Sequence, residues 1–159
     1  TITLTDRLPD RVLYSEPVPK QNWKITNETK EIAGYKCQKA TCTFRGRHYI
    51  AWFTREIPVK EGPWKFNGLP GLIVKIYDTH EHYDFELYSV KKEKKTIVFN
   101  DFGELDGVEY YEVSRKAYIN MSRNRLKAPF AGQDITFTRD GTPFTPQARR
   151  YDVIERDIK

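Results

Sequence analysis

The chain has 159 residues and a formal net charge of +5, and aromatic residues make up 14% of it. This length favours one domain with one core, and the ten Tyr and nine Phe favour β structure over a helical bundle. No run approaches the ~20 apolar residues that span a bilayer, and basic residues alternate with acids rather than forming a stripe. The composition therefore excludes a transmembrane helix and argues against nucleic-acid binding.

Strands are predicted first near the N-terminus, at Ile2 to Leu4, Val12 to Tyr14 and Trp23 to Asn27. A hairpin from Tyr35 to Thr54 follows, with Arg45-Gly46 as its two-residue turn, because the glycine can supply a positive φ. This turn pairs Phe44 with Arg47, and the register predicts a largely apolar face. The hairpin carries aromatic residues on both faces.

The same register settles the relation between Cys37 and Cys42. Five residues of extended chain separate them by roughly 16 Å and place them on opposite faces. A disulfide needs Cα atoms within about 7 Å, so we expect both cysteines to be unbridged.

A second strand is predicted at Leu72 to Asp78, with Leu72, Val74 and Ile76 on one face. Tyr83, Phe85 and Leu87 then alternate with acids in the next strand, and a shared apolar face requires an even loop that places His80 and His82 at the hairpin tip. A third strand, Thr96 to Phe99, would complete a meander.

After these strands, the apolar residues no longer alternate with polar ones. Val113, Ala117 and Met121 recur at four-residue spacing, which predicts one helix over Glu112 to Leu126. Its basic residues are interpreted as a solvated face: Arg115, Lys116, Arg123 and Arg125. From Ala128 onward, glycines and prolines predict an extended tail with one strand near Ile135 to Thr138.

The stretch GPWKFNGLPGLIVKIYD, Gly62 to Asp78, interrupts the chain just before its most apolar strand. Its prolines cannot donate ladder hydrogen bonds, and its glycines permit close backbone approach. A phosphate-binding loop is a poorer interpretation, because a strand rather than a helix N-terminus follows. We expect a structural corner, built by Gly68, Leu69, Pro70 and Gly71, that delivers Leu72 into the core.

The hexapeptide GLPGLI, with IAGYKCQKAT at Ile32 to Thr41 and GRHYIAWFTREIP at Gly46 to Pro58, resembles the GLPGLI family of envelope or secreted proteins of certain Gram-negative bacteria. The resemblance implies a periplasmic, envelope or secreted protein and no known catalytic activity. Members usually carry a signal peptide and further N-terminal sequence, so residues 1–159 would be one GLPGLI-type domain trimmed from a longer precursor. Family-like domains are associated with bowl-shaped antiparallel sheets, one of them attached to a secreted peptide:N-glycosidase.

Candidate chemistry is sparse. His80 and His82, among several carboxylates, form the most metal-like stretch, but a solvated loop is the stronger interpretation, and we expect no metal or cofactor. Cys37 lacks a local nucleophile motif and is better explained as a packed apolar side chain. Trp52, Trp64 and Phe66 could line a concave sheet and bind an apolar, peptide or sugar ligand. The competing interpretation is that these three aromatics are the core itself.

Together these observations predict an α+β, β-rich single domain: a strongly curved antiparallel sheet of six to eight strands, resembling the half-barrel of a lipoprotein carrier, with one main helix and an extended C-terminal tail. The expected function is a non-enzymatic extracytoplasmic protein that binds an apolar or peptide-like ligand or an envelope protein. Two alternatives stay open: a hydrolase, or accessory domain of a secreted hydrolase, and a structural assembly module. An enzyme should bring an acid, a base or a metal together in a cavity.

Overall fold

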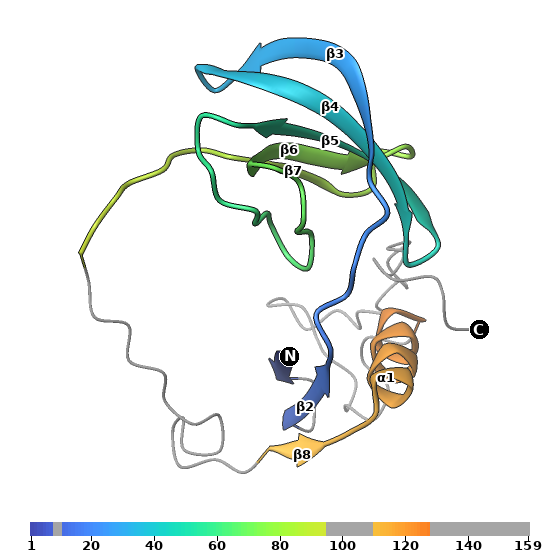
Figure 1. The fold of residues 1–159 in the computed structure, drawn as a ribbon. Helices are drawn as coiled ribbons and strands as arrows, with labels where there is room; N and C mark the ends of the chain where they lie inside the picture. Colours follow the sequence, from blue (N-terminus) through green and yellow to red (C-terminus); the bar gives the residue numbers. More distant parts are fainter. Residues whose placement is uncertain (8–10, 95–109, 128–159) are drawn as a thin grey trace, which may run out of the picture.

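A computed structural model of the protein describes residues 1–7, 11–94 and 110–127. Within these residues, eight strands form two sheets, and one helix follows the last strand (Figure 1). The larger sheet has the order β3-β4-β5-β6-β7, and the smaller has the order β1-β2-β8. The elements are β1 (Ile2–Arg7), β2 (Arg11–Glu16), β3 (Lys24–Ile32), β4 (Tyr35–Phe44), β5 (Arg47–Thr54), β6 (Leu72–Asp78), β7 (Asp84–Glu86), β8 (Tyr111–Glu112) and α1 (Arg115–Lys127).

The central hairpin, β4–β5, has the predicted register. Phe44 pairs with Arg47, and Cys42 pairs with Tyr49. Arg45 and Gly46 have φ angles of 51° and 76°, as a two-residue turn with two positive φ values requires. Both cysteines are free and buried, so the prediction that they form no disulfide is confirmed.

Both faces of the five-stranded sheet carry apolar clusters. The first cluster combines alternate residues of β4 and β5 with Phe66 and Leu69 from the loop 55–71, which covers this face. The second cluster lies on the opposite face and contains Cys37, Trp52 and Val74. The core is therefore two-sided, and its first side is closed by the loop that contains the glycine-proline corner.

Strand β6 does not keep the predicted alternation. Its pairing with β5 shifts between Trp52 and Phe53, so that Val74 is an extra residue between two paired ones. Ile73 and Ile76 pack in the first cluster, whereas Val74 packs in the second. The prediction that Val74 and Ile76 share a face is wrong because the bulge reverses the phase of the strand.

The β6–β7 hairpin has a loop with an even number of residues, as predicted. Tyr77 pairs with Asp84, and the backbone NH of Asp78 donates to the carbonyl of Tyr83, so residues 79–82 form the tip that carries the histidines. The predicted strands at 96–99 and 135–138 and the C-terminal tail lie outside the described residues.

The first two N-terminal strands form but do not join the large sheet, whereas the third, predicted at Trp23 to Asn27, is β3 of that sheet. β1 pairs with β2 in antiparallel fashion, and β8 pairs with β2 in parallel. The predicted single, strongly curved half-barrel is therefore wrong: within the described residues there are two sheets, and the larger is open, with β3 and β7 as its edges. The prediction of a β-rich α+β fold with one main helix is confirmed.

Helix α1 begins at Arg115, three residues after the predicted start. Ser114 caps it, since the NH of Ala117 donates to the Ser114 hydroxyl at 3.2 Å. Ile119 is its buried residue, and the ring of Tyr118 packs against Tyr14 of β2 with centroids 4.9 Å apart. Within the described residues, no helix combines the length and apolar character needed to cross a bilayer.

Candidate functional site

The three aromatics predicted to bind a ligand do not come together. Trp64 and Phe66 lie at the first cluster with ring centroids 5.4 Å apart, whereas Trp52 belongs to the second cluster on the other face of the sheet. Phe66 is fully buried and also packs edge-on against Phe44 and Tyr49. The three cannot line one concavity. Ligand binding by any one of them stays a prediction.

The glycine-proline corner closes tightly on the end of β5. A Cβ atom on Gly71 would lie 2.0 Å from the carbonyl oxygen of Thr54, which is backbone and cannot move aside. Gly68 has a φ of 88°, and Leu69 is buried in the first cluster. The NH of Leu72 donates to the carbonyl of Ile57, so the corner leads directly into β6.

The histidine tip lies beside a buried ion pair. Arg47 donates to Asp78 at 3.0 Å, and the two side chains are 1% and 0% exposed. The imidazole Nδ1 of His80 lies 3.9 Å from the same carboxylate, and the His80 and His82 rings are 5.6 Å apart. No group of three or more His, Cys, Asp or Glu side chains that could hold a metal ion occurs among the residues described.

The Asp78 carboxylate is held in its charged form. Burial by itself would raise its pKa, but the NH groups of Tyr83 and His82 and the charge of Arg47 outweigh burial and lower the pKa below the ordinary value. The NH of Tyr83 donates to it at 2.8 Å. A carboxylate held this way closes the β6–β7 hairpin and is a poor proton donor at neutral pH.

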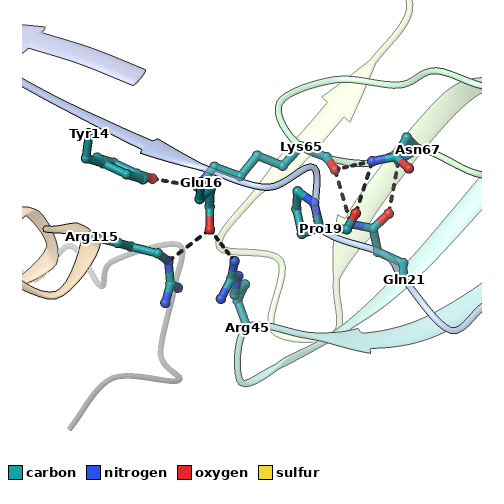
Figure 2. A network of polar contacts seen from close by, with 8 residues as sticks. All are labelled: Tyr14, Glu16, Pro19, Gln21, Arg45, Lys65, Asn67 and Arg115. Carbon is teal, nitrogen blue, oxygen red and sulfur yellow. Dashed lines mark hydrogen bonds and ion pairs between the residues drawn. The ribbon is translucent and has the colours of Figure 1, made fainter. Parts of the chain in front are cut away.

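The two sheets meet at a second buried charge cluster, centred on Glu16 at the end of β2 (Figure 2). Lys65 donates to Glu16 Oε1 at 2.5 Å and to the Tyr14 hydroxyl at 2.6 Å. Arg45 donates to Glu16 Oε2 at 2.6 Å, and Arg115 Nε lies 3.6 Å from that oxygen. One carboxylate thus joins the small sheet, helix α1, the β4–β5 turn and the corner loop.

A set of amide contacts extends this junction along the segment between β2 and β3 (Figure 2). Gln21 donates to the carbonyl of Lys65 and accepts from the NH of Asn67, each at 3.1 Å. Trp23 Nε1 donates to the carbonyl of Asn67 at 2.8 Å. The loop that covers the first cluster is therefore fixed by polar side chains from the N-terminal segment.

These junction residues were not singled out from the sequence, and Arg115, interpreted there as part of a solvated face, is a partner of Glu16. A signal was available for the carboxylate. Val12 and Tyr14 are buried on alternate positions of β2, and Glu16 occupies the next position of the same phase. A charge in the buried phase of a strand predicts a partner. The identity of the cations that pair with Glu16 depends on segments that are far apart in the sequence.

Comparison with known proteins identifies the family. The family model described as "N-glycanase peptide, N-terminal domain" (PNGase F-II N-terminal) matches residues 11–112, more than half of the chain. Two structures of PNGF-II, in the C2 and P21 space groups, match with TM-scores of 0.50 and 0.51 at 29% and 28% identity. Each match covers 70% of this chain and 20% of the PNGF-II chain. No curated protein matches.

These matches overturn two expectations. Membership of the GLPGLI family is wrong: that resemblance rested on stretches between Ile32 and Asp78, whereas the N-glycanase match extends over residues 11–112 and includes strands of both sheets. A non-enzymatic extracytoplasmic protein that binds an apolar or peptide-like ligand or an envelope protein is also wrong as a description of this chain's role, and the alternative of a hydrolase accessory domain is better supported. The chain spans about a fifth of the length of PNGF-II. It belongs to the family of N-glycanase peptide N-terminal domains.

Proposed function

We propose that this chain acts as the N-terminal, accessory domain of a glycan-releasing hydrolase of the peptide N-glycanase type. The observation that carries the proposal is the family match over residues 11–112, together with the 29% identity to PNGF-II. The match covers β2 to β8, and therefore Glu16, Arg45 and Lys65 of the junction as well as the large sheet.

The chemistry of the two buried carboxylates supports an accessory role. Glu16 is surrounded by Lys65, Arg45 and Arg115, and Asp78 is bound by Arg47 and backbone NH groups. Each carboxylate is occupied by partners from other elements, so these groups stabilise the tertiary structure. An acid or base that attacks a substrate has to face a cavity that the substrate can enter.

An extracytoplasmic location, in the periplasm, envelope or medium, forms part of the same proposal. N-linked glycans are carried by secreted and surface proteins, so a hydrolase that releases them meets its substrates outside the cytoplasm. Fractionation of the native host, with detection of the chain by antibody, tests this location. Detection in the cytoplasmic fraction alone would contradict it.

A domain exchange tests the proposed function. This chain should replace the matching fifth of PNGF-II and preserve release of the glycan from an N-glycopeptide, followed by the change in peptide mass. Two controls accompany it: PNGF-II from which that segment is deleted, and the 159-residue chain alone. We expect the exchanged enzyme to exceed the deleted one and the chain alone to release nothing. A folded exchanged enzyme no more active than the deleted one would refute the proposal, as would glycan release by the chain alone.

A further inference from the structure

Alternate residues of β7 direct their backbone groups away from β6. The NH of Asp78 donates to Tyr83, the NH of Leu87 donates to Val74, and Phe85 lies between them in the same ladder. In an antiparallel pair, the hydrogen-bonded residues alternate with residues whose NH and C=O point away. Residues 84, 86 and 88 therefore direct their backbone groups outward. Within the described residues no strand lies on that side of β7.

A groove of about 520 Å³ lies along this edge. Its apolar lining includes Leu72 and Val74 of β6, Phe85 of β7 and Leu87 directly after β7, and Gly62-Pro63 of the corner loop also lines it. Side chains of an added strand would alternate between this groove and solvent, because successive residues of a strand point to opposite faces. The groove accordingly accepts every second residue of an extended peptide.

The charge along the groove is negative although the chain as a whole is basic. Glu61, Asp84 and Glu86 line it, and among the residues that the structure describes no basic side chain belongs to its lining. Lys75 contacts Glu86 at 2.5 Å and Asp84 at 3.3 Å, so it offsets one of the three negative charges. Asp84 and Glu86 alternate with Phe85 and share the face of Lys75, so their remaining negative charge complements lysine or arginine at the peptide positions that point away from the apolar groove.

Charged residues and short length also protect sheet edges against aggregation, and β7 has both features. Tyr88, at the end of this edge, favours a binding role over protection against aggregation. Its side chain is 98% exposed beside the groove, and an aromatic ring left in water does not protect an edge. Tyrosine is enriched among the residues that anchor protein interfaces.

We propose that the free edge of β7 binds an extended, basic stretch of polypeptide as an added strand, with apolar side chains in the groove and Tyr88 as an anchor. The inference deepens the proposed function and rests on it, because a peptide N-glycanase acts on a glycan that is attached to a polypeptide. The bound stretch would be the polypeptide part of that substrate.

Binding is tested on the 159-residue chain with a fluorescein-labelled peptide of about ten residues that alternates valine and lysine, long enough to cover one strand. Fluorescence anisotropy gives the Kd. We expect saturable binding that weakens with added salt. A matched peptide with glutamate for lysine should bind more weakly, and so should one methylated at alternate backbone nitrogens in the register that faces β7. Equal binding of all three peptides would overturn the proposal.

Variants at two positions separate backbone pairing from charge. Glu86→Pro removes an NH that faces away from β6, so the ladder to β6 stays intact. Glu86→Ala removes the same carboxylate and keeps that NH. Loss of one hydrogen bond predicts that Glu86→Pro binds about two- to tenfold more weakly than Glu86→Ala. Tyr88→Ala should also weaken binding, and circular dichroism checks that each variant is folded.

Equal affinity of folded Glu86→Pro and Glu86→Ala, or unchanged affinity in Tyr88→Ala, would overturn strand addition at β7. These measurements involve no glycan and no hydrolysis. If the chain does not bind the peptide, the result of the domain exchange still stands. If the exchanged enzyme is inactive, the measured peptide binding still stands. The two proposals therefore fail in separate experiments.

Discussion

The large sheet and the junction at Glu16 are held together by different forces. In the large sheet, alternate residues of β4 and β5 pack against Phe66 and Leu69, and non-directional apolar burial dominates. At the junction, a single carboxylate meets cations from three other parts of the chain. Apolar packing tolerates exchange of one residue for another of similar volume, whereas a buried charge depends on each of its partners. The two regions should therefore respond differently to substitution.

The largest effect is expected at the corner that covers the large sheet. Gly71→Val would drive a side chain into the carbonyl of Thr54, and we expect the free energy of unfolding to fall by at least about 3 kcal/mol. Urea denaturation followed by circular dichroism measures the loss. Gly68→Ala is the matched control, because a Cβ atom there meets nothing within 4 Å and only its φ of 88° is unfavourable. Equal losses in the two variants would show that close approach at Gly71 is unimportant.

A buried charge within the large sheet sharpens the comparison. Asp78→Asn leaves the Arg47 guanidinium buried without its counter-charge, which should cost about 3 kcal/mol. Chemical denaturation of the variant provides the measurement. If the free energy of unfolding falls by no more than is typical of an exposed ion pair, the Arg47–Asp78 pair contributes little to stability beyond its packing.

At the junction, Glu16→Gln should loosen the contact between the sheets while leaving the large sheet folded. We expect about 2 kcal/mol of lost stability, because Lys65 and two arginines lose their shared counter-charge. Hydrogen exchange should show faster exchange in α1 and β2, with β4 and β5 still protected. Uniform loss of protection in both regions would indicate one cooperative unit and remove the distinction between them.

Acid should weaken the large sheet through Asp78. Its pKa is lower in the folded chain than in the unfolded chain, so the unfolded state binds more protons as the pH falls. The stabilisation is fully present above the ordinary aspartate pKa of about 3.9 and is lost as the pH falls through the folded value. Denaturation midpoints measured across this range should drop more steeply for the wild type than for Asp78→Asn. If the midpoints of the two proteins depended on pH in the same way, the lowered pKa of Asp78 would be contradicted.

The smallest effect is expected at the surface. Lys39 and Glu28 form an ion pair at 2.9 Å between β4 and β3, but the Glu28 side chain is 60% exposed. Glu28→Gln should change the free energy of unfolding by less than about 0.5 kcal/mol. The same urea titration tests it, and a loss as large as that of Glu16→Gln would show that burial does not decide the strength of these pairs.

Local pattern was sufficient for much of the large sheet. Arg45-Gly46 between two alternating runs determined the β4–β5 register, and that register separated Cys37 from Cys42. The parity of apolar residues placed the loop at 79–82. These predictions succeed because turn geometry and the two-residue period act between neighbours in sequence.

Local pattern failed where distant segments decide the outcome. The bulge at Val74, formed against β5, reverses the phase of β6. The start of α1 is a separate, local error, because the Ser114 cap three residues before Ala117 was not recognised. The first two N-terminal strands were found, but the sheet that they join was not, because β8 pairs with β2 from almost a hundred residues away.

By itself, the sequence determined the β-rich class, the central hairpin and the free cysteines. Only the tertiary structure decided which cations surround Glu16, that Trp52 and Phe66 lie on opposite faces, and that β7 is an edge strand among the residues described. The physical reason is range: turns and alternation are set by neighbouring residues, whereas charge pairing, face assignment and free edges depend on which distant segments come together.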